Sequence, residues 1–232
     1  CWAAFQRIFV VSEEIMAPFL RVHPACAEKL RVLPNLIDPA AIRRRSAEPG
    51  GFADGWQGPR LLTVGRLTYQ KGFDLAIQAM RILKDRGYEA RWYVLGEGEL
   101  RSSLEKQIAA LGLEEDFLLL GAVENPYPYY AQADIYVHAT RFEGRSIAIQ
   151  EAQSLGRPMV VSDCSGNRLQ VTDGQDGLLC PLEPAAIAQA VGALLDDPDL
   201  RRRLGRAAIE RTQPGRGDAG GLLEALTGGD LV

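Results

Sequence analysis

Residues 60–72 read R-L-L-T-V-G-R-L-T-Y-Q-K-G, and this stretch decides the fold. The apolar run Arg60–Val64 predicts a short strand buried on both faces of a parallel sheet. Gly65 then turns the chain, and we expect a helix to begin after Lys71. Because ligands of open α/β sheets bind beyond the carboxyl ends of the strands, this junction is a candidate binding site.

Short apolar runs of the same kind alternate with amphipathic stretches along the rest of the chain. The stretches Phe73–Arg86, Leu100–Leu111 and Pro184–Leu195 place their apolar residues on one helical face. This alternation predicts an α/β fold with a doubly wound, Rossmann-like parallel sheet. The expected strands are Ile8–Val11, Arg31–Leu33, Arg60–Val64, Arg91–Leu95, Phe117–Leu120, Ile135–His138, Met159–Val161 and Gly177–Cys180.

A glycine- and proline-rich stretch, residues 47–59, divides the chain. It predicts a linker or an exposed loop. Before it we expect only two strands and one helix, about Glu13–Val22, which cannot bury a core alone. The sequence therefore predicts the end of a preceding domain and a link over residues 1–48, the main domain over residues 59–212, and a tail over residues 213–232.

The composition is that of an ordinary globular protein, with 24% charged residues and a net charge of −4. This charge does not favour a nucleic-acid partner. The four cysteines are widely spaced, which argues against a zinc or disulfide scaffold and favours a reducing, cytoplasmic setting. Two histidines and no carboxylate cluster predict no metal site. The chain begins at Cys1 and shows no leader pattern, so we expect a piece of a longer protein.

Arg66 and Lys71 follow the expected strand Arg60–Val64 at the start of a helix. The planar guanidinium of arginine and the point charge of lysine can together clamp a diphosphate, and helix N-termini also favour anions. The alternative is a solvated arginine and lysine in a surface loop.

A second stretch, residues 142–152, reads F-E-G-R-S-I-A-I-Q-E-A and follows the expected strand Ile135–His138. If a helix begins near Ser146, Glu143 lies in the loop before it and Glu151 lies in its second turn. The two carboxylates can accept hydrogen bonds from sugar and ribose hydroxyls. The alternative is a helix that carries acidic residues near its start because the helix dipole favours them there.

The backbone of this loop is the third part of the candidate site. Gly144 allows a close backbone approach. The amides of Arg145, Ser146 and Ile147 are expected to be unpaired donors of the first helical turn. A nucleotide sugar needs this combination of donors for phosphate and acceptors for hydroxyls.

The R-x4-K pattern at Arg66–Lys71 and the E-x7-E pattern at Glu143–Glu151 together resemble glycosyltransferase family 4. The resemblance runs from about Ile8 to Ala208 in the family's order. It implies a retaining, nucleotide-sugar-dependent enzyme with two Rossmann-like domains, the GT-B architecture, of which this chain is the C-terminal, donor-binding domain. Further stretches that carry the resemblance are Arg31–Asp38, Val94–Leu100, Leu118–Val123, Ala133–Thr140 and Asp173–Leu179.

The resemblance also implies a role for each matching residue. Arg66 and Lys71 would bind the donor diphosphate and stabilise its charge as it leaves. Glu143 would face the sugar, and Glu151 would bind the ribose hydroxyls. The residues Gly144–Ile147 would contact phosphate or sugar through their backbone N–H groups.

Gly65 completes the expected donor-binding set. The chain departs from many family members at Arg145 and Ser146. Those members have an aromatic residue or leucine at the first position and glycine or proline at the second. The basic side chain at this position leaves the identity of the sugar open and adds a candidate contact to phosphate.

The implied reaction transfers a hexosyl group from a nucleoside diphosphate sugar to a glycan, a lipid or another acceptor. It implies no cofactor and no metal. The acceptor would bind chiefly to the N-terminal domain, so we expect these 232 residues to bind nucleotide but hardly to transfer sugar. The basic clusters Arg43–Arg45 and Arg201–Arg203 are expected to be solvated; the alternative is peripheral contact with the inner face of the membrane.

Two other functions stay open at this point. One is a non-catalytic nucleotide-binding or interaction module on the same scaffold, against which the intact Arg66, Lys71, Glu143 and Glu151 argue. The other is a nucleotide-sugar epimerase or a phosphorylase of GT-B architecture. His138 lies on an apolar strand, and we expect a satisfied core histidine there and not a ligand.

Overall fold

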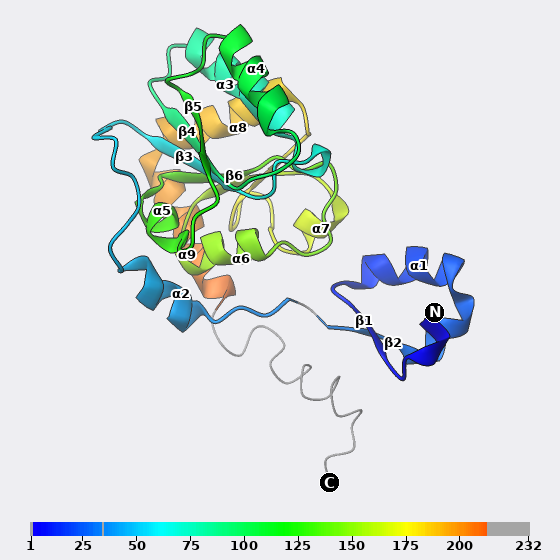
Figure 1. Ribbon diagram of the computed structural model, residues 1–232. Helices are drawn as coiled ribbons and strands as arrows, with labels where there is room; N and C mark the ends of the chain where they lie inside the picture. Colours follow the sequence, from blue (N-terminus) through cyan, green and yellow to red (C-terminus); the bar gives the residue numbers. More distant parts are fainter. Residues whose placement is uncertain (1, 34, 213–232) are drawn as a thin grey trace.

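The computed structural model describes residues 2–33 and 35–212, which form two units joined by an extended link (Figure 1). The larger unit is built on a six-stranded parallel sheet with helices on both faces, so the predicted doubly wound α/β fold is confirmed. Its strands are β3 (Arg60–Val64), β4 (Arg91–Leu95), β5 (Phe117–Gly121), β6 (Ile135–His138), β7 (Met159–Ser162) and β8 (Leu178–Cys180).

The strands of this sheet run in the order β5-β4-β3-β6-β7-β8. The chain starts at the centre with β3, moves outward through β4 and β5, and then crosses back to β6 on the other side of β3. Leu61 and Leu62 of β3 lie beside Ile135 and Tyr136 of β6. The order of the strands therefore reverses between β3 and β6, which is where ligands of such sheets bind.

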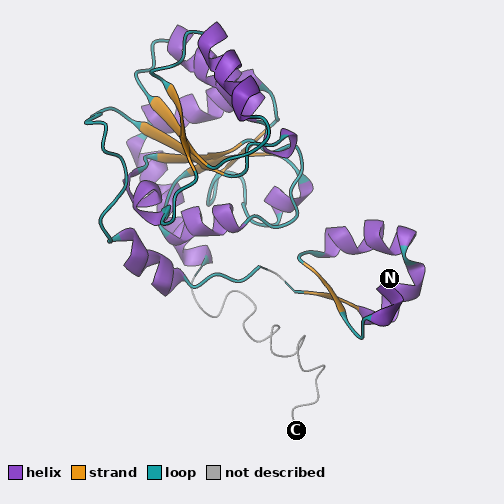
Figure 2. Cartoon of the chain, in the orientation of Figure 1, coloured by secondary structure: helices purple, strands orange, loops and turns teal. Residues whose placement is uncertain are grey.

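Side chains alternate across the sheet and form two cores, because successive residues of a strand point to opposite faces. The helices are α3 (Phe73–Asp85), α4 (Arg101–Ala110), α5 (Tyr127–Gln132), α6 (Ile147–Ser154), α7 (Ser165–Arg168), α8 (Pro184–Asp196) and α9 (Pro198–Arg211). Leu61 belongs to the core under α3, α4 and α8, whereas Leu62 belongs to the core under α5 and α6. Figure 2 shows the strands between these two helical layers.

The smaller, N-terminal unit holds two parallel strands, β1 (Ile8–Val10) and β2 (Leu30–Val32), and the helix α1 (Glu13–Val22). Short 3-10 helices span Trp2–Ala4 and Pro24–Lys29. The unit has a small buried cluster of its own. Its members come from the two strands and the second 3-10 helix, and they are Ile8, Val10, Cys26 and Leu30. Phe19 of α1 packs against this cluster.

A second helix before residue 47, α2 (Pro39–Ser46), corrects the prediction of one helix in this region. Asp38 caps it, since its Oδ1 accepts hydrogen bonds from the amides of Ala40 and Ala41 at 2.9 and 3.0 Å. Proline follows the cap in the first turn, which is a favourable position. The helix packs on α5, where the Arg45 guanidinium lies 5.1 Å from the centre of the Tyr127 ring. Arg45 is therefore a packed residue and not part of a solvated face.

The stretch between α2 and β3 is irregular, as its glycines and prolines predict, but it is held to the larger unit. Phe52 packs against Tyr93 and Tyr129, with ring centres 4.3 and 5.0 Å away. The expected tail over residues 213–232 lies outside the described residues.

The loops after β3 and β6 come into backbone contact at Gly72. This residue has a φ of 60°, and a Cβ atom there would lie 2.2 Å from the carbonyl oxygen of Ala139. Gly112, between α4 and β5, has a φ of 61°, but a Cβ atom there would meet nothing within 4 Å. The two glycines therefore share a backbone conformation and differ in the space around them.

We predict that Gly72→Ala destabilises the fold much more than Gly112→Ala. Left-handed backbone alone should cost about 1–2 kcal/mol in both variants. Because the new methyl group must also displace the Ala139 carbonyl, Gly72→Ala should lose a further ~1–3 kcal/mol. Urea unfolding measures both free energies, and equal losses would show that the two loops do not touch at this point.

Candidate functional site

The candidate site begins at the carboxyl ends of β3 and β6, which the sheet places side by side. The loops that follow these strands share hydrogen bonds to one backbone carbonyl, that of Gln70. The Thr140 hydroxyl donates to it at 2.9 Å, and the Arg141 amide donates at 2.8 Å. The two loops are therefore one structural unit.

Lys71 and Glu143 form an ion pair between these two loops. The Lys71 Nζ atom lies 2.5 Å from the Glu143 Oε2 atom, and their side chains are only 16% and 12% exposed. Gly65 lies beneath the lysine, since a Cβ atom at Gly65 would be 3.6 Å from Lys71 Cδ. The structure thus brings together three residues that the sequence assigns to the site.

His138, the last residue of β6, adds a second donor to the same carboxylate oxygen. Its Nε2 atom lies 3.1 Å from Glu143 Oε2, and its Nδ1 atom lies 3.1 Å from the Tyr136 hydroxyl. Burial lowers the pKa of His138, so the ring is neutral near pH 7. With the proton on Nε2, the ring donates to Glu143 and accepts from Tyr136. The prediction of a satisfied core histidine is correct, but sequence reasoning missed its contact with the site.

Glu143 is held as a carboxylate. Burial by itself raises its pKa, but the hydrogen bonds from His138 and Lys71, with the charge of Lys71, lower it to about 2. Both donors contact Oε2, whereas among the described residues Oε1 has only the Gln70 amide nitrogen, at 3.5 Å. Oε1 is therefore the oxygen that can accept a hydrogen bond from a ligand.

Arg66 differs from Lys71 in having no counter-charge. It follows Gly65 directly at the end of β3, and its side chain is exposed. Within residues 2–33 and 35–212 its guanidinium has neither a hydrogen bond nor an ion pair. An anionic ligand can therefore engage the Arg66 guanidinium without breaking a contact with the described residues.

The first turn of α6 corrects one part of the prediction. The Ser146 amide is not free, because it donates to the Gln170 Oε1 atom at 2.6 Å, and the Ser146 carbonyl accepts from Gln170 Nε2 at 2.8 Å. Ser146 and Gln170 are both buried, and buried backbone groups need partners. In the described part of the chain, no hydrogen bond is found for the amides of Arg145 and Ile147.

Gly144 and Arg145 lie against the N-terminal unit and its link. A Cβ atom at Gly144 would be 2.9 Å from Ile15 Cδ1 and 3.2 Å from Val11 Cγ2, so a side chain at this position would require these two side chains to move. The Asn35 side-chain amide donates to the Arg145 carbonyl at 2.8 Å. The Arg145 Nε atom is buried and has no partner among the described residues. The loop of Glu143 is thus in contact with both units.

Glu151 lies in the second turn of α6, as the sequence predicts, and its contacts are with α5. The Tyr127 hydroxyl donates to Oε1 and the Tyr130 hydroxyl to Oε2, each at 3.1 Å. Burial raises the pKa of Glu151, although these two hydrogen bonds act in the other direction. Sequence reasoning missed both tyrosines, because only the packing of α5 on α6 brings them to this carboxylate.

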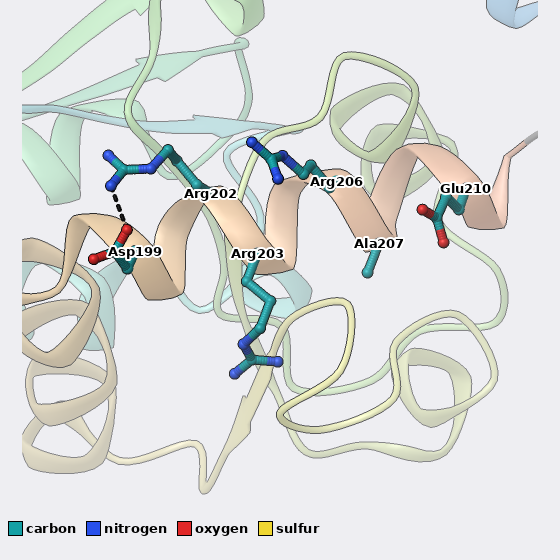
Figure 3. Close-up of a pocket in the computed structure, with 6 residues that line it drawn as sticks. All are labelled: Asp199, Arg202, Arg203, Arg206, Ala207 and Glu210. Atoms are coloured by element: carbon teal, nitrogen blue, oxygen red, sulfur yellow. Dashed lines mark hydrogen bonds and ion pairs between the residues drawn. The ribbon is translucent and has the colours of Figure 1, made fainter.

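A shallow hollow on α9 lies apart from these residues (Figure 3). All its lining residues belong to one helix, and the Arg202 guanidinium is paired with Asp199. Arg201 next to it is not solvated as expected, because it donates to the carbonyls of Leu194 and Leu195 at the end of α8. The hollow is a furrow along an exposed helix face and not part of the site at β3 and β6.

The described residues carry neither a metal cluster nor a membrane-spanning helix. Over residues 2–33 and 35–212, no three histidine, cysteine or acidic side chains group so that they could hold a metal ion. None of the helices there combines the length and the apolar character that a membrane crossing requires.

Comparison with known proteins places this geometry in a family context. The model of the family described as glycosyl transferases group 1 matches residues 55–211. Alpha-D-kanosaminyltransferase of Streptomyces kanamyceticus is 33% identical over 174 residues, which cover 74% of this chain and 44% of that protein. N-acetylgalactosamine-N,N'-diacetylbacillosaminyl-diphospho-undecaprenol 4-alpha-N-acetylgalactosaminyltransferase of Campylobacter jejuni is 32% identical over 188 residues, which cover 80% of this chain and 50% of that protein.

Solved structures show the same fold. HepE of Anabaena, crystallised in complex with UDP-glucose, matches with a TM-score of 0.80 at 20% identity, over 97% of this chain and 64% of that one. The chain spans about half the length, or less, of the first curated relatives it matches.

We predict that the ionised Glu143 makes the stability of the fold depend on acid pH. Its pKa in the folded chain, about 2, is below the ordinary value of 4.5. The carboxylate therefore stabilises the folded state above about pH 4.5, and this contribution is lost as the pH falls from 4.5 towards 2. The difference in unfolding free energy between the wild type and Glu143→Gln should shrink across this window.

Urea unfolding at a series of pH values checks this prediction. Glu210→Gln, at an exposed position of α9, is the matched control and should follow the wild-type profile. A difference between wild type and Glu143→Gln that stays constant down to about pH 2 would contradict the lowered pKa.

Proposed function

This chain belongs to the glycosyl transferases group 1, and we propose that it is the donor-binding part of a retaining hexosyltransferase of family 4 type. The donor is a nucleoside diphosphate sugar, and the acceptor is a glycan, a lipid or another hydroxyl compound. The proposal needs neither a metal nor a cofactor, because the cationic side chains of the site can stabilise the leaving diphosphate.

One observation carries this proposal, the ion pair of Lys71 and Glu143 between the loops after β3 and β6. It gathers a cation and an acceptor at the point where the strand order reverses. A nucleotide sugar carries a diphosphate next to a polyhydroxylated ring, so it requires both types of group within one site.

Arg66 and Lys71 bind the diphosphate in this proposal. Arg66 is exposed and unpaired in the described chain, so it can bind an anion without losing a partner. Lys71 has three N–H donors, and its contact with Glu143 leaves others for phosphate oxygens. The free amides of Arg145 and Ile147 add backbone donors at the start of α6.

The carboxylates of Glu143 and Glu151 accept hydrogen bonds from the hydroxyl groups of the donor in this proposal. Glu143 offers Oε1 to the sugar, and Glu151 offers its remaining acceptor positions to the ribose, beside Tyr127 and Tyr130. Because the Ser146 amide is occupied by Gln170, the hydroxyl is the group of Ser146 that is left for the donor.

The reaction breaks the bond between the anomeric carbon and the diphosphate oxygen, so negative charge grows on the diphosphate. Arg66 and Lys71 lower the energy of that charge, and Lys71, which is already held in a partly buried position, needs little reorganisation to do so. The acceptor hydroxyl then attacks the face that the diphosphate leaves, its proton passes to the departing diphosphate oxygen, and the configuration is retained.

The acceptor would be bound largely outside these 232 residues. The two relatives named above extend well beyond the matched region, and the name of one includes diphospho-undecaprenol. We therefore propose a cytoplasmic enzyme that works at the inner face of the membrane if its acceptor is lipid-linked. The exposed arginines of α2 and α9, such as Arg43 and Arg206, would favour an anionic surface.

We predict that two variants distinguish the residue that binds the ribose from the residue that binds the diphosphate. Glu151→Ala should weaken the binding of UDP or GDP by about 1–3 kcal/mol, because a charged acceptor for ribose is lost. The same variant should bind pyrophosphate as the wild type does. Arg66→Ala should weaken both ligands, because it removes a cation from the diphosphate.

Isothermal titration calorimetry of the wild type and the variants measures these effects. Arg202→Ala is the matched control, since it removes an exposed arginine from α9. Equal losses of nucleotide and pyrophosphate in Glu151→Ala would refute the ribose assignment. Unchanged binding in Arg66→Ala would refute the diphosphate assignment.

We further predict that this chain binds donor nucleotide but transfers little sugar. Holding two reactants together can contribute up to about 7–11 kcal/mol to catalysis, and a part that holds only the donor loses most of it. The assay compares the 232-residue chain with the full-length protein, using the donor and acceptor of the latter. Comparable turnover would show that the acceptor site lies within this chain.

A further inference from the structure

The carboxylate of Glu143 is held from one side only. Lys71 and His138 both donate to Oε2, at 2.5 and 3.1 Å, and Oε1 is left with a long contact to Gln70. If Glu143 is to receive a sugar hydroxyl, the group that fixes Oε2 decides where Oε1 points.

Lys71 is a poor candidate for this task once a donor is bound. Its long side chain is flexible, and a diphosphate competes with Glu143 for its ammonium group. Glu143 and the diphosphate therefore share the ammonium group of Lys71, and its contact with Glu143 weakens when it binds phosphate oxygens.

His138 has no such freedom. It is 1% exposed, and its backbone is part of β6, in register with Val161 of β7. Its Nδ1 atom faces the Tyr136 hydroxyl at 3.1 Å, and Tyr136 is itself fully buried. A neutral ring is not attracted to a diphosphate, so it stays with Glu143 when the donor binds.

We propose that His138 is the positioning residue of Glu143, and that the Tyr136 hydroxyl, by donating to Nδ1, supports the tautomer in which His138 donates from Nε2 to the ionised Glu143. The histidine holds Oε2 so that Oε1 faces the donor sugar while Lys71 serves the diphosphate. This inference rests on the proposed function for the identity of the ligand, but the contact between His138 and Glu143 does not depend on it.

Substitution of His138 by leucine and by glutamine tests the proposal. His138→Leu removes the donor, whereas the side-chain amide of His138→Gln can place an N–H group close to the Nε2 position. Tyr136→Phe removes the hydroxyl that faces Nδ1. Tyr93→Phe is its matched control, since Tyr93 is also a buried tyrosine of the sheet but bonds to Asp54.

The ligand measurement uses UDP-glucose, UDP-N-acetylglucosamine and GDP-mannose beside UDP and GDP, by calorimetry. His138→Leu should lose about tenfold in affinity for the sugar nucleotide that the wild type binds best. It should lose less than about twofold for the matching nucleoside diphosphate, and His138→Gln should recover most of the difference. Equal losses for both ligands, or a glutamine variant no better than leucine, would overturn the proposal.

Nitrogen-15 NMR of the histidine ring supplies a readout without ligand. The wild type and Tyr93→Phe should carry the ring proton on Nε2, and Tyr136→Phe should show a larger share of the Nδ1 tautomer than the wild type, because the hydroxyl that donates to Nδ1 is lost. A wild-type ring protonated on Nδ1 would refute the role of His138. If the wild type binds none of the sugar nucleotides, the proposed function is refuted, and the NMR result still decides whether His138 holds Glu143.

Discussion

The ion pair of Lys71 and Glu143 is the interaction on which the candidate site depends. Both side chains are largely buried, and a buried charge without a partner is costly. Their meeting requires β3 and β6 to be neighbours and the two following loops to touch. Gly65 beneath the lysine and Gly72 against the Ala139 carbonyl provide the space for this contact. The ion pair of Lys71 and Glu143 thus depends on the strand order, which places β3 beside β6.

The surroundings of this pair keep it in place. Arg141 forms an ion pair with Asp74 of α3 at 2.7 Å, and its guanidinium lies 4.0 Å from the centre of the Tyr69 ring. The loop after β6 is therefore bound to the start of α3. The same loop binds the Gln70 carbonyl. The cation of the site is therefore carried by a rigid turn, which reduces the entropy lost when a ligand binds.

Two carboxylates eight residues apart have opposite electrostatic surroundings. Hydrogen bonds and the charge of Lys71 outweigh burial at Glu143 and lower its pKa, whereas burial dominates at Glu151, where the donors are the neutral hydroxyls of Tyr127 and Tyr130. Glu143 is a fixed, fully ionised acceptor beside cations. Glu151 is an acceptor in a largely aromatic setting, which suits contact with a nucleoside more than with phosphate.

The sequence by itself determined the strands, the helices α1, α3, α4, α6 and α8 and the two charged motifs, because periodicity and turn residues are local properties. It did not predict the short helices α5 and α7 or the last helix, α9. It did not reveal α2, whose main signal is the short Asp38–Pro39 cap, nor the partner of the Ser146 amide, which is Gln170 on a distant loop. Only the tertiary structure decided that Lys71 meets Glu143, that His138 holds the same carboxylate, and that α5 supplies tyrosines to Glu151. These contacts join residues far apart in the chain or on different elements, and the strand order and helix packing that create them leave no local pattern.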